Sequence, residues 1–235
     1  KPKLLILTLK SGFCEDSRLQ QGWKINNIIE NLISHITNFI PVSIELKNRL
    51  EAICETQNFP KNHFLHKPNR ICLNTYFISK GLIRTYYLKN EKEITDNFSA
   101  ENEWITSIYS FLKNIPDQFH IQTLEETELV RVSLNDLEIC FKDFPEMERF
   151  GRMLISKYFL EQSERIISLQ FNSAKERYQF FENTSKNKLA RVPLGMLASH
   201  LGMTQETLSR IRAEKTFFWS ISNLPTLFSF NFAKN

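Results

Sequence analysis

The sequence has few cysteines and no motif that would join them. Its cysteines, Cys14, Cys54, Cys72 and Cys140, lie far apart and form no C-x-x-C pair. Small secreted domains that depend on disulfides place their cysteines much more densely than this. The spacing therefore predicts four reduced cysteines, most of them buried.

Long apolar runs are also missing. The opening KPKLLILTLK holds only a short apolar run and lacks a small-residue cleavage site. A segment that crosses a bilayer needs roughly 18 consecutive apolar residues. We therefore expect a cytoplasmic protein with no membrane partner.

Catalytic and metal-binding motifs are absent as well. The chain has no phosphate-loop motif, and its five histidines fall into no zinc-binding or Ser-His-Asp pattern. His63 and His66 have the spacing of metal ligands, but no third ligand accompanies them, so we expect both in a strand and its loop. We expect no enzyme, cofactor or metal, although residues that are distant in sequence can still converge in space.

What the chain does have is an ordinary globular composition with a slight excess of positive charge. Hydrophobic residues make up 42% and charged residues 24%, and 20 phenylalanines supply packing material. A net charge of +4 permits a polyanionic partner without requiring one, because the total says nothing about clustering. The length of 235 residues suits two small domains.

The hydrophobic pattern changes along the chain. Amphipathic helices are predicted over 26–55, and short antiparallel strands over about 60–135, with Gly81 in a tight turn. A helix of some 25 residues is predicted from Pro145. The sequence thus predicts an α+β chain with an N-terminal extension (1–27), a β-roll or jelly-roll domain with flanking helices (28–144), a long helix (145–171) and a helical domain (172–235).

The long helix has a wide apolar face. Its members include Met147, Phe150, Leu154, Tyr158 and Ile166. This face could pack against the β-domain of its own chain, or it could pair with the same helix of a second chain. The pattern of apolar residues by itself favours neither arrangement.

The stretch LASHLGMTQETLSRIR (197–212) has the spacing of a helix-turn-helix. Ala198 is small where the second helix crosses the first, and Gly202 can adopt the left-handed turn. Five apolar residues fill the wedge between the helices: Leu197, Leu201, Met203, Leu208 and Ile211. An ordinary helical hairpin with solvated charges would show the same spacing, so the motif alone leaves both interpretations open.

In a DNA-binding motif of this kind, the N-terminal part of the second helix enters the major groove. Gln205, Glu206 and Arg210 have the chemistry to read adenine, cytosine and guanine, respectively. Phosphate contacts would come from the same helix and from cations just upstream of the motif. The predicted DNA-contacting residues are Thr204, Gln205, Glu206, Thr207, Ser209, Arg210 and Arg212, with Lys186, Lys188 and Arg191 on phosphates.

With strands, a long helix and a helix-turn-helix in this order, the chain resembles the Crp/Fnr family of bacterial transcription regulators over about residues 28–213. The most specific pieces are YFISKGLIRTYY (76–87), AKERYQFF (174–181) and the helix-turn-helix stretch, in the divergent style of Bacteroidetes members. The resemblance implies a cyclic-nucleotide-binding-like β-roll, a homodimer through the long helix and a palindromic double-stranded DNA site. It also implies a small-molecule effector of unknown identity, with RNA polymerase as a further candidate partner.

The effector site departs from the family pattern. Cyclic-AMP-binding members place a Gly-Glu pair in a phosphate-binding turn and an Arg-Ser or Arg-Thr pair about ten residues later, whereas this chain has WITSIYSFLKNIPDQFHI (104–121). A buried ribose phosphate needs a cation, so we do not expect cyclic AMP to bind. Cys14 alone cannot form the cysteine cluster of iron–sulfur-sensing members. The nearest polar candidates for an effector pocket are Arg84, Thr106, Ser107 and Tyr109, unless Trp104, Phe111 and Phe119 fill it.

The last segment, KTFFWSISNLPTLFSFNFAKN (215–235), is unusually apolar for the end of such a chain. It could cap the helical domain or obstruct DNA. The sequence as a whole predicts a dimeric, sequence-specific transcription regulator whose sensor domain does not bind cyclic AMP. The alternative is a ligand-sensing or protein-interaction module whose DNA binding is impaired.

Overall fold

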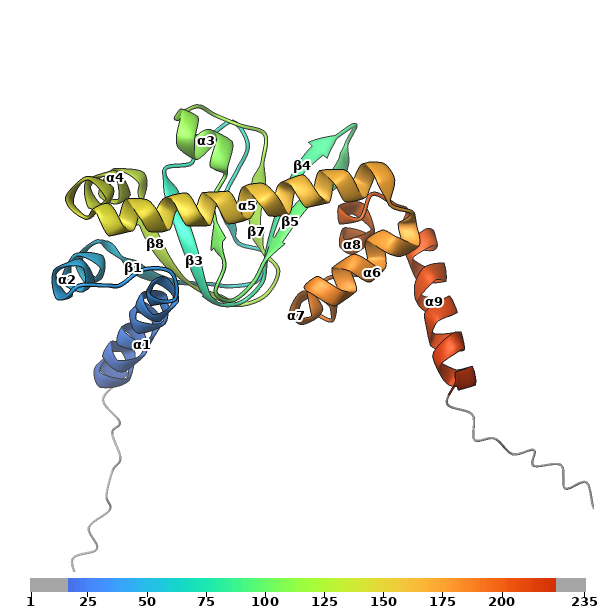
Figure 1. The fold of residues 1–235 in the computed structure, drawn as a ribbon, viewed down its shortest axis with the longest axis horizontal. Helices are drawn as coiled ribbons and strands as arrows, with labels where there is room; N and C mark the ends of the chain where they lie inside the picture. The colour runs from blue at the N-terminus through green and yellow to red at the C-terminus, as the bar shows by residue number, and fades with distance from the viewer. Residues whose placement is uncertain (1–16, 223–235) are drawn as a thin grey trace, which may run out of the picture.

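A long helix connects a β-roll to a group of C-terminal helices (Figure 1). The computed structural model describes residues 17–222, with side chains described over 27–214. The molecule is elongated because the long helix runs along its main axis and carries the last helices past the end of the roll. The α+β architecture predicted from the sequence is confirmed.

Two helices precede the strands. In α1 (Ser17–Thr37) and α2 (Ile44–Ile53), the apolar faces turn inward, and Leu32 and Leu46 are fully buried where they pack on the first sheet. The Ser43 hydroxyl caps α2 by accepting the backbone N–H of Leu46 at 3.1 Å. The amphipathic helices predicted for this region are therefore confirmed.

Two four-stranded antiparallel sheets form the roll. The first has the strand order β1-β8-β3-β6 and the second β2-β7-β4-β5, with the short helix α3 (Ile108–Lys113) between β6 and β7. The strands are β1 (Glu55–Phe59), β2 (Phe64–His66), β3 (Asn74–Lys80), β4 (Ile83–Lys89), β5 (Lys92–Ser99), β6 (Trp104–Ile105), β7 (His120–Thr123) and β8 (Thr127–Ser133). In this order β5 is an edge strand.

Two tight turns in the roll require left-handed backbone. Gly81 joins β3 to β4 with a φ of 118°, and a Cβ there would lie 2.5 Å from the Thr127 Oγ1 atom. The β4–β5 hairpin turns at Asn90 and Glu91, whose φ values of 49° and 62° suit a two-residue type I′ turn. The tight turn predicted at Gly81 is confirmed.

Side chains of the strands alternate between the interior of the roll and its outer faces. Ile78, Ile83 and Leu129 are fully buried between the two sheets. Phe77 and Val130 point to the opposite side and pack with the flanking helices. The interior of the roll is therefore packed with apolar side chains from both sheets.

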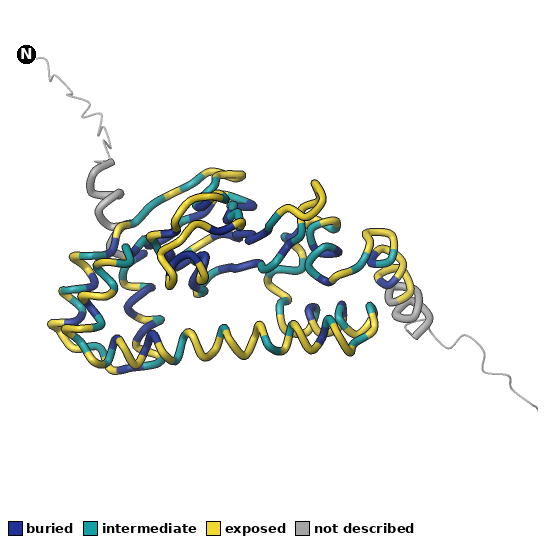
Figure 2. Tube along the Cα trace, turned by 90° about the horizontal axis from the view of Figure 1, so that it is seen from above, coloured by how far each residue is buried: buried dark blue, intermediate teal, exposed yellow. Residues whose placement is uncertain are grey.

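The long helix bridges the two halves of the molecule, which are the β-roll with its flanking helices and the group of C-terminal helices. After α4 (Leu134–Asp143), α5 (Pro145–Phe171) begins at the predicted proline, and its 27 residues span about 40 Å at 1.5 Å per residue. Met147 and Phe150 anchor its first half on the roll. Its outer side is exposed along much of its length (Figure 2).

The last four helices form what we call the C-terminal unit. They are α6 (Ala174–Thr184), α7 (Lys186–Leu189), α8 (Leu194–His200) and α9 (Gln205–Ser222). A capping box starts α6, in which Ser173 and Glu176 each bond the backbone N–H of the other. The side chains of the predicted apolar tail (215–235) lie outside the described residues. Within 17–222, no helix is both long and apolar enough to cross a membrane.

Candidate nucleic-acid interface

The helix-turn-helix stretch folds as two helices, α8 and α9, joined by a tight turn. Gly202 has a φ of 64°, and the Met203 backbone N–H reaches back to the Ala198 carbonyl at 3.0 Å. Leu197 and Leu208 are buried where the helices meet. The small residue, the glycine and the apolar wedge thus lie where the motif requires them.

A side chain of α6 holds the turn in place. The Arg177 guanidinium donates to the carbonyls of Leu201 at 2.7 Å, Asn172 at 2.6 Å and Gly202 at 3.3 Å. These bonds satisfy carbonyls at the ends of α5 and α8, which have no partner within their own helices. Arg177 lies in the AKERYQFF piece, but the spacing of that piece gave no sign of this role.

The start of α9 presents a polar surface to solvent. Thr204 caps the helix, because its hydroxyl accepts the backbone N–H of Thr207 at 3.2 Å. The backbone of Glu206 itself and the Thr204 hydroxyl bond the Glu206 carboxylate and lower its pKa. Thr207 is half-buried, whereas six predicted contacts are exposed: Thr204, Gln205, Glu206, Ser209, Arg210 and Arg212. These exposed polar and charged side chains all lie on the first turns of α9 or at its N-cap.

Of the upstream cations, Lys186 is exposed and Lys188 is not. The Lys188 ammonium lies 2.8 Å from the carboxylate of Glu103 and donates to the Phe98 carbonyl at 2.8 Å. Glu103 and Phe98 both belong to the β-roll side of the molecule. The predicted phosphate contact of Lys188 is thus replaced, in this arrangement, by an ion pair across the two halves.

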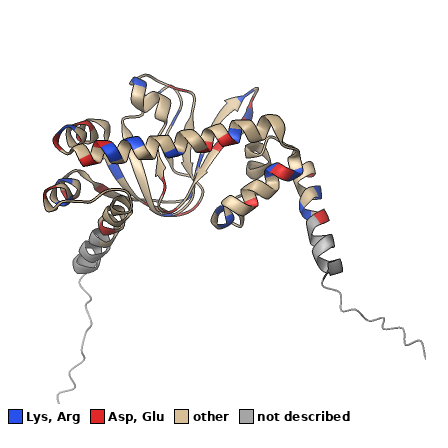
Figure 3. Cartoon of the chain, viewed as in Figure 1, with Lys and Arg blue, Asp and Glu red and all other residues tan. Residues whose placement is uncertain are grey.

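Arg191 is bound in the same way. Its guanidinium donates to both carboxylate oxygens of Glu101 at 2.9 Å, and to Glu125 at 2.5 Å. Burial alone would raise the pKa of Glu101, but the bonds from Arg191 and from the Gly81 backbone N–H outweigh it and lower the pKa to about 2. We call Lys188, Arg191 and their three glutamates the ion-pair cluster. Figure 3 shows the basic residues of α7 and the surrounding charges.

The C-terminal unit also covers the free edge of β5. The Ser199 hydroxyl accepts the Thr95 backbone N–H at 3.0 Å and donates to the Glu93 carbonyl at 3.0 Å. The His200 Nδ1 atom lies 3.0 Å from the Asp96 carbonyl oxygen. Side chains of α8 thus satisfy backbone groups that an edge strand would otherwise leave to water.

His200 is half-buried at this contact and is held in a neutral form. Its ring packs edge-on against Phe98 and Phe181, with centroids 5.4 and 5.5 Å away. Burial, reinforced by the nearby Arg165 cation, lowers the pKa of His200 to about 3. The ring can therefore donate to the Asp96 carbonyl without carrying a charge into the core.

The four residues predicted for an effector pocket lie in separate environments. Arg84 is 1% exposed and donates to the Thr95 hydroxyl at 2.8 Å and to Glu93 at 2.5 Å. Thr106 donates to the Asn74 carbonyl at 2.9 Å, whereas Tyr109 on α3 is 55% exposed. Trp104 and Phe111 are buried, and Phe119 is half-buried. Arg84, Thr106 and Ser107 thus each bond to a separate partner, and Tyr109 is exposed.

Ser107 leads to a buried polar group that sequence reasoning missed. Its hydroxyl donates to the Asp117 carboxylate, whose other oxygen lies 2.9 Å from the His66 Nε2 atom. Asp117 is buried and follows Ser107 by ten residues in the sequence. His66 therefore lies in a buried contact with a carboxylate, whereas His63 is exposed and stacks on Phe59.

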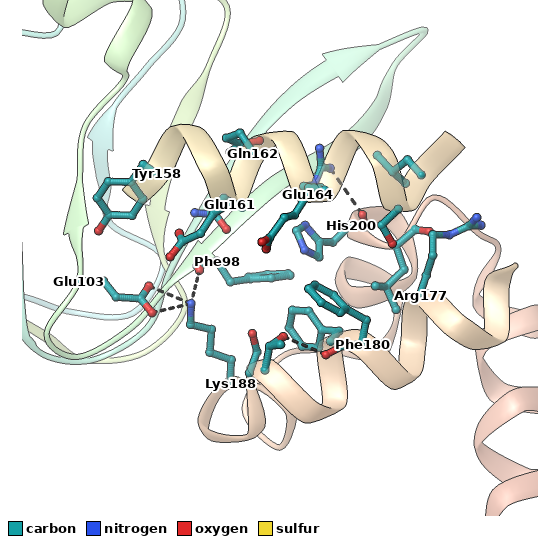
Figure 4. A pocket seen from close by; sticks show the side chains of 18 of the residues that line it. Phe98, Glu103, Tyr158, Glu161, Gln162, Glu164, Arg177, Phe180, Lys188 and His200 are labelled. Atoms are coloured by element: carbon teal, nitrogen blue, oxygen red, sulfur yellow. Dashed lines mark hydrogen bonds and ion pairs between the residues drawn. The ribbon is translucent and has the colours of Figure 1, made fainter. Parts of the chain in front are cut away.

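A cavity of about 330 Å³ lies between the β-roll, α5 and the C-terminal unit (Figure 4). Glu161 and Glu164 of α5 form one wall, Phe180 of α6 the opposite wall, and Lys188 with Glu103 one end. Burial raises the pKa of Glu161, and the nearby Lys157 partly offsets this. None of the four predicted pocket residues is among the described residues that line this cavity.

No protein-family model and no curated protein sequence match the chain. Solved structures share its fold. FixK2 from Bradyrhizobium japonicum has a TM-score of 0.63 at 14% identity, covering 75% of this chain and 90% of that one. The c-di-GMP-responsive global regulator CLP from Xanthomonas campestris has 0.60 at 18%, covering 73% and 91%. A protein from Eubacterium rectale described as a transcriptional regulator of the Crp/Fnr family has 0.58 at 21%, covering 81% and 91%.

Proposed function

Because the chain shares the fold of Crp/Fnr regulators, we propose that it is a dimeric, sequence-specific DNA-binding transcription regulator. The observation that carries the proposal is the solvent-facing start of α9. Gln205, Glu206 and Arg210 project there from a helix whose buried side, including Leu208 and Ile211, fixes it on α8. In a helix-turn-helix this end of the second helix enters the major groove.

The outer face of α5 supports the dimer. Five large apolar residues on it are between 49% and 69% exposed: Ile155, Phe159, Leu160, Ile166 and Ile167. Apolar area of this extent along one helix marks an interaction surface. A second copy of α5 running parallel would cover it and bring both C-terminal units to the same end of the dimer. The two α9 helices could then reach successive major grooves of a palindromic site, about 34 Å apart.

The sensor role rests on different observations. The stretch 104–121 holds no arginine, and its one buried carboxylate, Asp117, is paired with His66, which argues against cyclic AMP as the effector. The cavity between the β-roll, α5 and the C-terminal unit has walls from both halves of the molecule. It is a better candidate for a small-molecule site than the four residues Arg84, Thr106, Ser107 and Tyr109. This cavity also favours a ligand-sensing module as the second candidate function.

The test is selection of binding sequences from a random duplex library, followed by titration of the selected site. We expect binding that weakens steeply with salt, because phosphate contacts release counterions. Arg210→Ala should cost about 1–3 kcal/mol of discrimination between the selected duplex and a scrambled one.

Arg70→Ala is the matched control, since Arg70 is exposed in the β-roll, between β2 and β3. It should leave discrimination unchanged. An Arg210→Ala protein that discriminates as well as the wild type would show that Arg210 reads no base. Selection that enriches no sequence would favour the ligand-sensing module instead.

A further inference from the structure

In the ion-pair cluster, the cations just upstream of the helix-turn-helix form ion pairs with acids of the β-roll. Arg191 lies three residues before α8, and Lys188 lies in α7. In a helix-turn-helix the first helix crosses the DNA backbone, so residues leading into it are well placed for phosphates. Here both cations face carboxylates instead.

The geometry of these pairs resembles phosphate binding. Arg191 contacts both oxygens of the Glu101 carboxylate, the same two-point contact that a guanidinium makes with a phosphate. Lys188 contacts Glu103 as a point charge, as lysine does with phosphates. A carboxylate in either place therefore occupies the donors that a DNA phosphate would use.

The pairs are also exposed enough to be exchanged. The side chains of Arg191, Glu101 and Glu125 are 26%, 31% and 38% exposed, so water and salt reach them. The Lys188–Glu103 pair is less exposed, at 12% and 25%. Ion pairs of this kind contribute little to stability once they are screened. A polyanion such as duplex DNA can therefore compete for the same cations.

We propose that Lys188 and Arg191 are phosphate-binding side chains that Glu101, Glu103 and Glu125 withhold from DNA. The β-roll acids and the DNA backbone thus compete for two cations, and full backbone contact requires the ion-pair cluster to open. The inference rests on the proposed function, and it adds to it two contacts and the groups that regulate them.

The test replaces the three acids together, as Glu101→Gln, Glu103→Gln and Glu125→Gln. The probe is a labelled 30-base-pair duplex of arbitrary sequence, because phosphate contacts do not depend on sequence. Each added phosphate contact steepens the dependence of log affinity on log salt by about 0.9, so we expect a slope steeper by about 2 and tighter binding at low salt.

The control carries the same change in net charge at exposed acids outside the cluster: Glu91→Gln, Glu126→Gln and Glu138→Gln. It should bind more tightly only through the change in overall charge, with the slope of the wild type. Adding Lys188→Gln and Arg191→Gln to the acid variant should return its slope to the wild-type value. Hydrogen exchange at the Thr95 amide, which bonds Ser199 across the two halves, should quicken in the acid variant and not in the control.

The outcomes distinguish failure of this inference from failure of the proposed function. If the wild type binds duplex and the acid variant has the slope of its control, the cations are not withheld and the inference alone is wrong. If the steeper slope survives the loss of Lys188 and Arg191, other residues make the new contacts and the inference is wrong as well. If no variant binds duplex at any salt concentration, the proposed function fails and takes the inference with it.

Discussion

At the scale of single residues, the charge state of His200 links stability to pH. Burial holds its pKa at about 3 in the folded protein, whereas a histidine in an unfolded chain titrates near 6.5. Between these two values the unfolded state binds one more proton than the folded state. The stabilisation is therefore fully present above pH 6.5 and is lost progressively as the pH falls towards 3.

His200→Asn should remove this pH dependence while keeping an N–H donor for the Asp96 carbonyl. Between pH 7.5 and pH 5, we expect the free energy of unfolding of the wild type to fall by about 2 kcal/mol more than that of the variant, at 1.4 kcal/mol per pH unit. Urea unfolding at both pH values measures this. Burial also lowers the pKa of His35 and His120, but both remain in each protein and cancel in the comparison.

The control for this comparison is His63→Asn, because His63 is exposed on the β-roll. It should leave the pH dependence of the wild type intact. Equal pH dependence of wild type and His200→Asn would mean that His200 is not buried as a neutral ring.

Sequence and structure agree best on residues whose roles are local. Ala198 and Gly202 were predictable because a helix crossing and a left-handed turn each constrain one position. The partners of Arg191 lie 66 and 90 residues away in sequence, and those of His66 lie 51 away. The spacing of such residues in the sequence does not indicate these pairs, because only the folded chain brings the partners together.

At the scale of elements, α5 has two faces with different tasks. Its inner face packs on the roll through Met147 and Phe150, and the Tyr158 hydroxyl accepts the Trp104 backbone N–H at 2.8 Å. Its outer face carries exposed apolar residues such as Phe159 and Ile166. The sequence showed a wide apolar face but could not divide it, because both faces share the same helical period.

Introducing charge on the outer face of α5 should separate the protomers. Phe159→Glu with Ile166→Glu removes two side chains that each contribute about 1.5–3 kcal/mol when buried, in both copies of the helix. We expect a monomer at micromolar concentration where the wild type is a dimer, measured by sedimentation velocity. The same chemical change at Ile44 and Leu88, which are 75% and 57% exposed elsewhere, should leave the assembly unchanged. A monomeric wild type would contradict the proposed dimer.

At the scale of the whole molecule, one apolar cluster joins the two halves. Leu82, Phe98 and Leu124 of the roll pack with Phe181 and Leu197 of the C-terminal unit. Together with the ion-pair cluster, this contact makes the two halves one body in the described structure. The order of strands, long helix and terminal helices was readable from the sequence, whereas this docking was not, because no local pattern specifies which apolar faces meet.

Truncating Phe98 should uncouple the two halves. The side chain is 1% exposed, so Phe98→Ala should cost about 3–5 kcal/mol. In calorimetry we expect one unfolding transition for the wild type and two for the variant. Phe77→Ala removes an equally buried ring from the cluster between the first sheet and the helices, and should lower the temperature of a single transition. Two transitions in the wild type would show that the halves unfold independently.

The covering of β5 by α8 has a consequence for how the chain is made. Thr95 and Glu93 receive their partner Ser199 only after a further 104 and 106 residues, respectively. At synthesis rates of about 5–20 residues per second, the ribosome needs about 5–20 s to produce that stretch. During this interval the hairpin leaves the ribosome with an open strand edge, the kind of surface that other nascent chains can join. The nascent chain is therefore most vulnerable to pairing with other chains just before its last helices emerge.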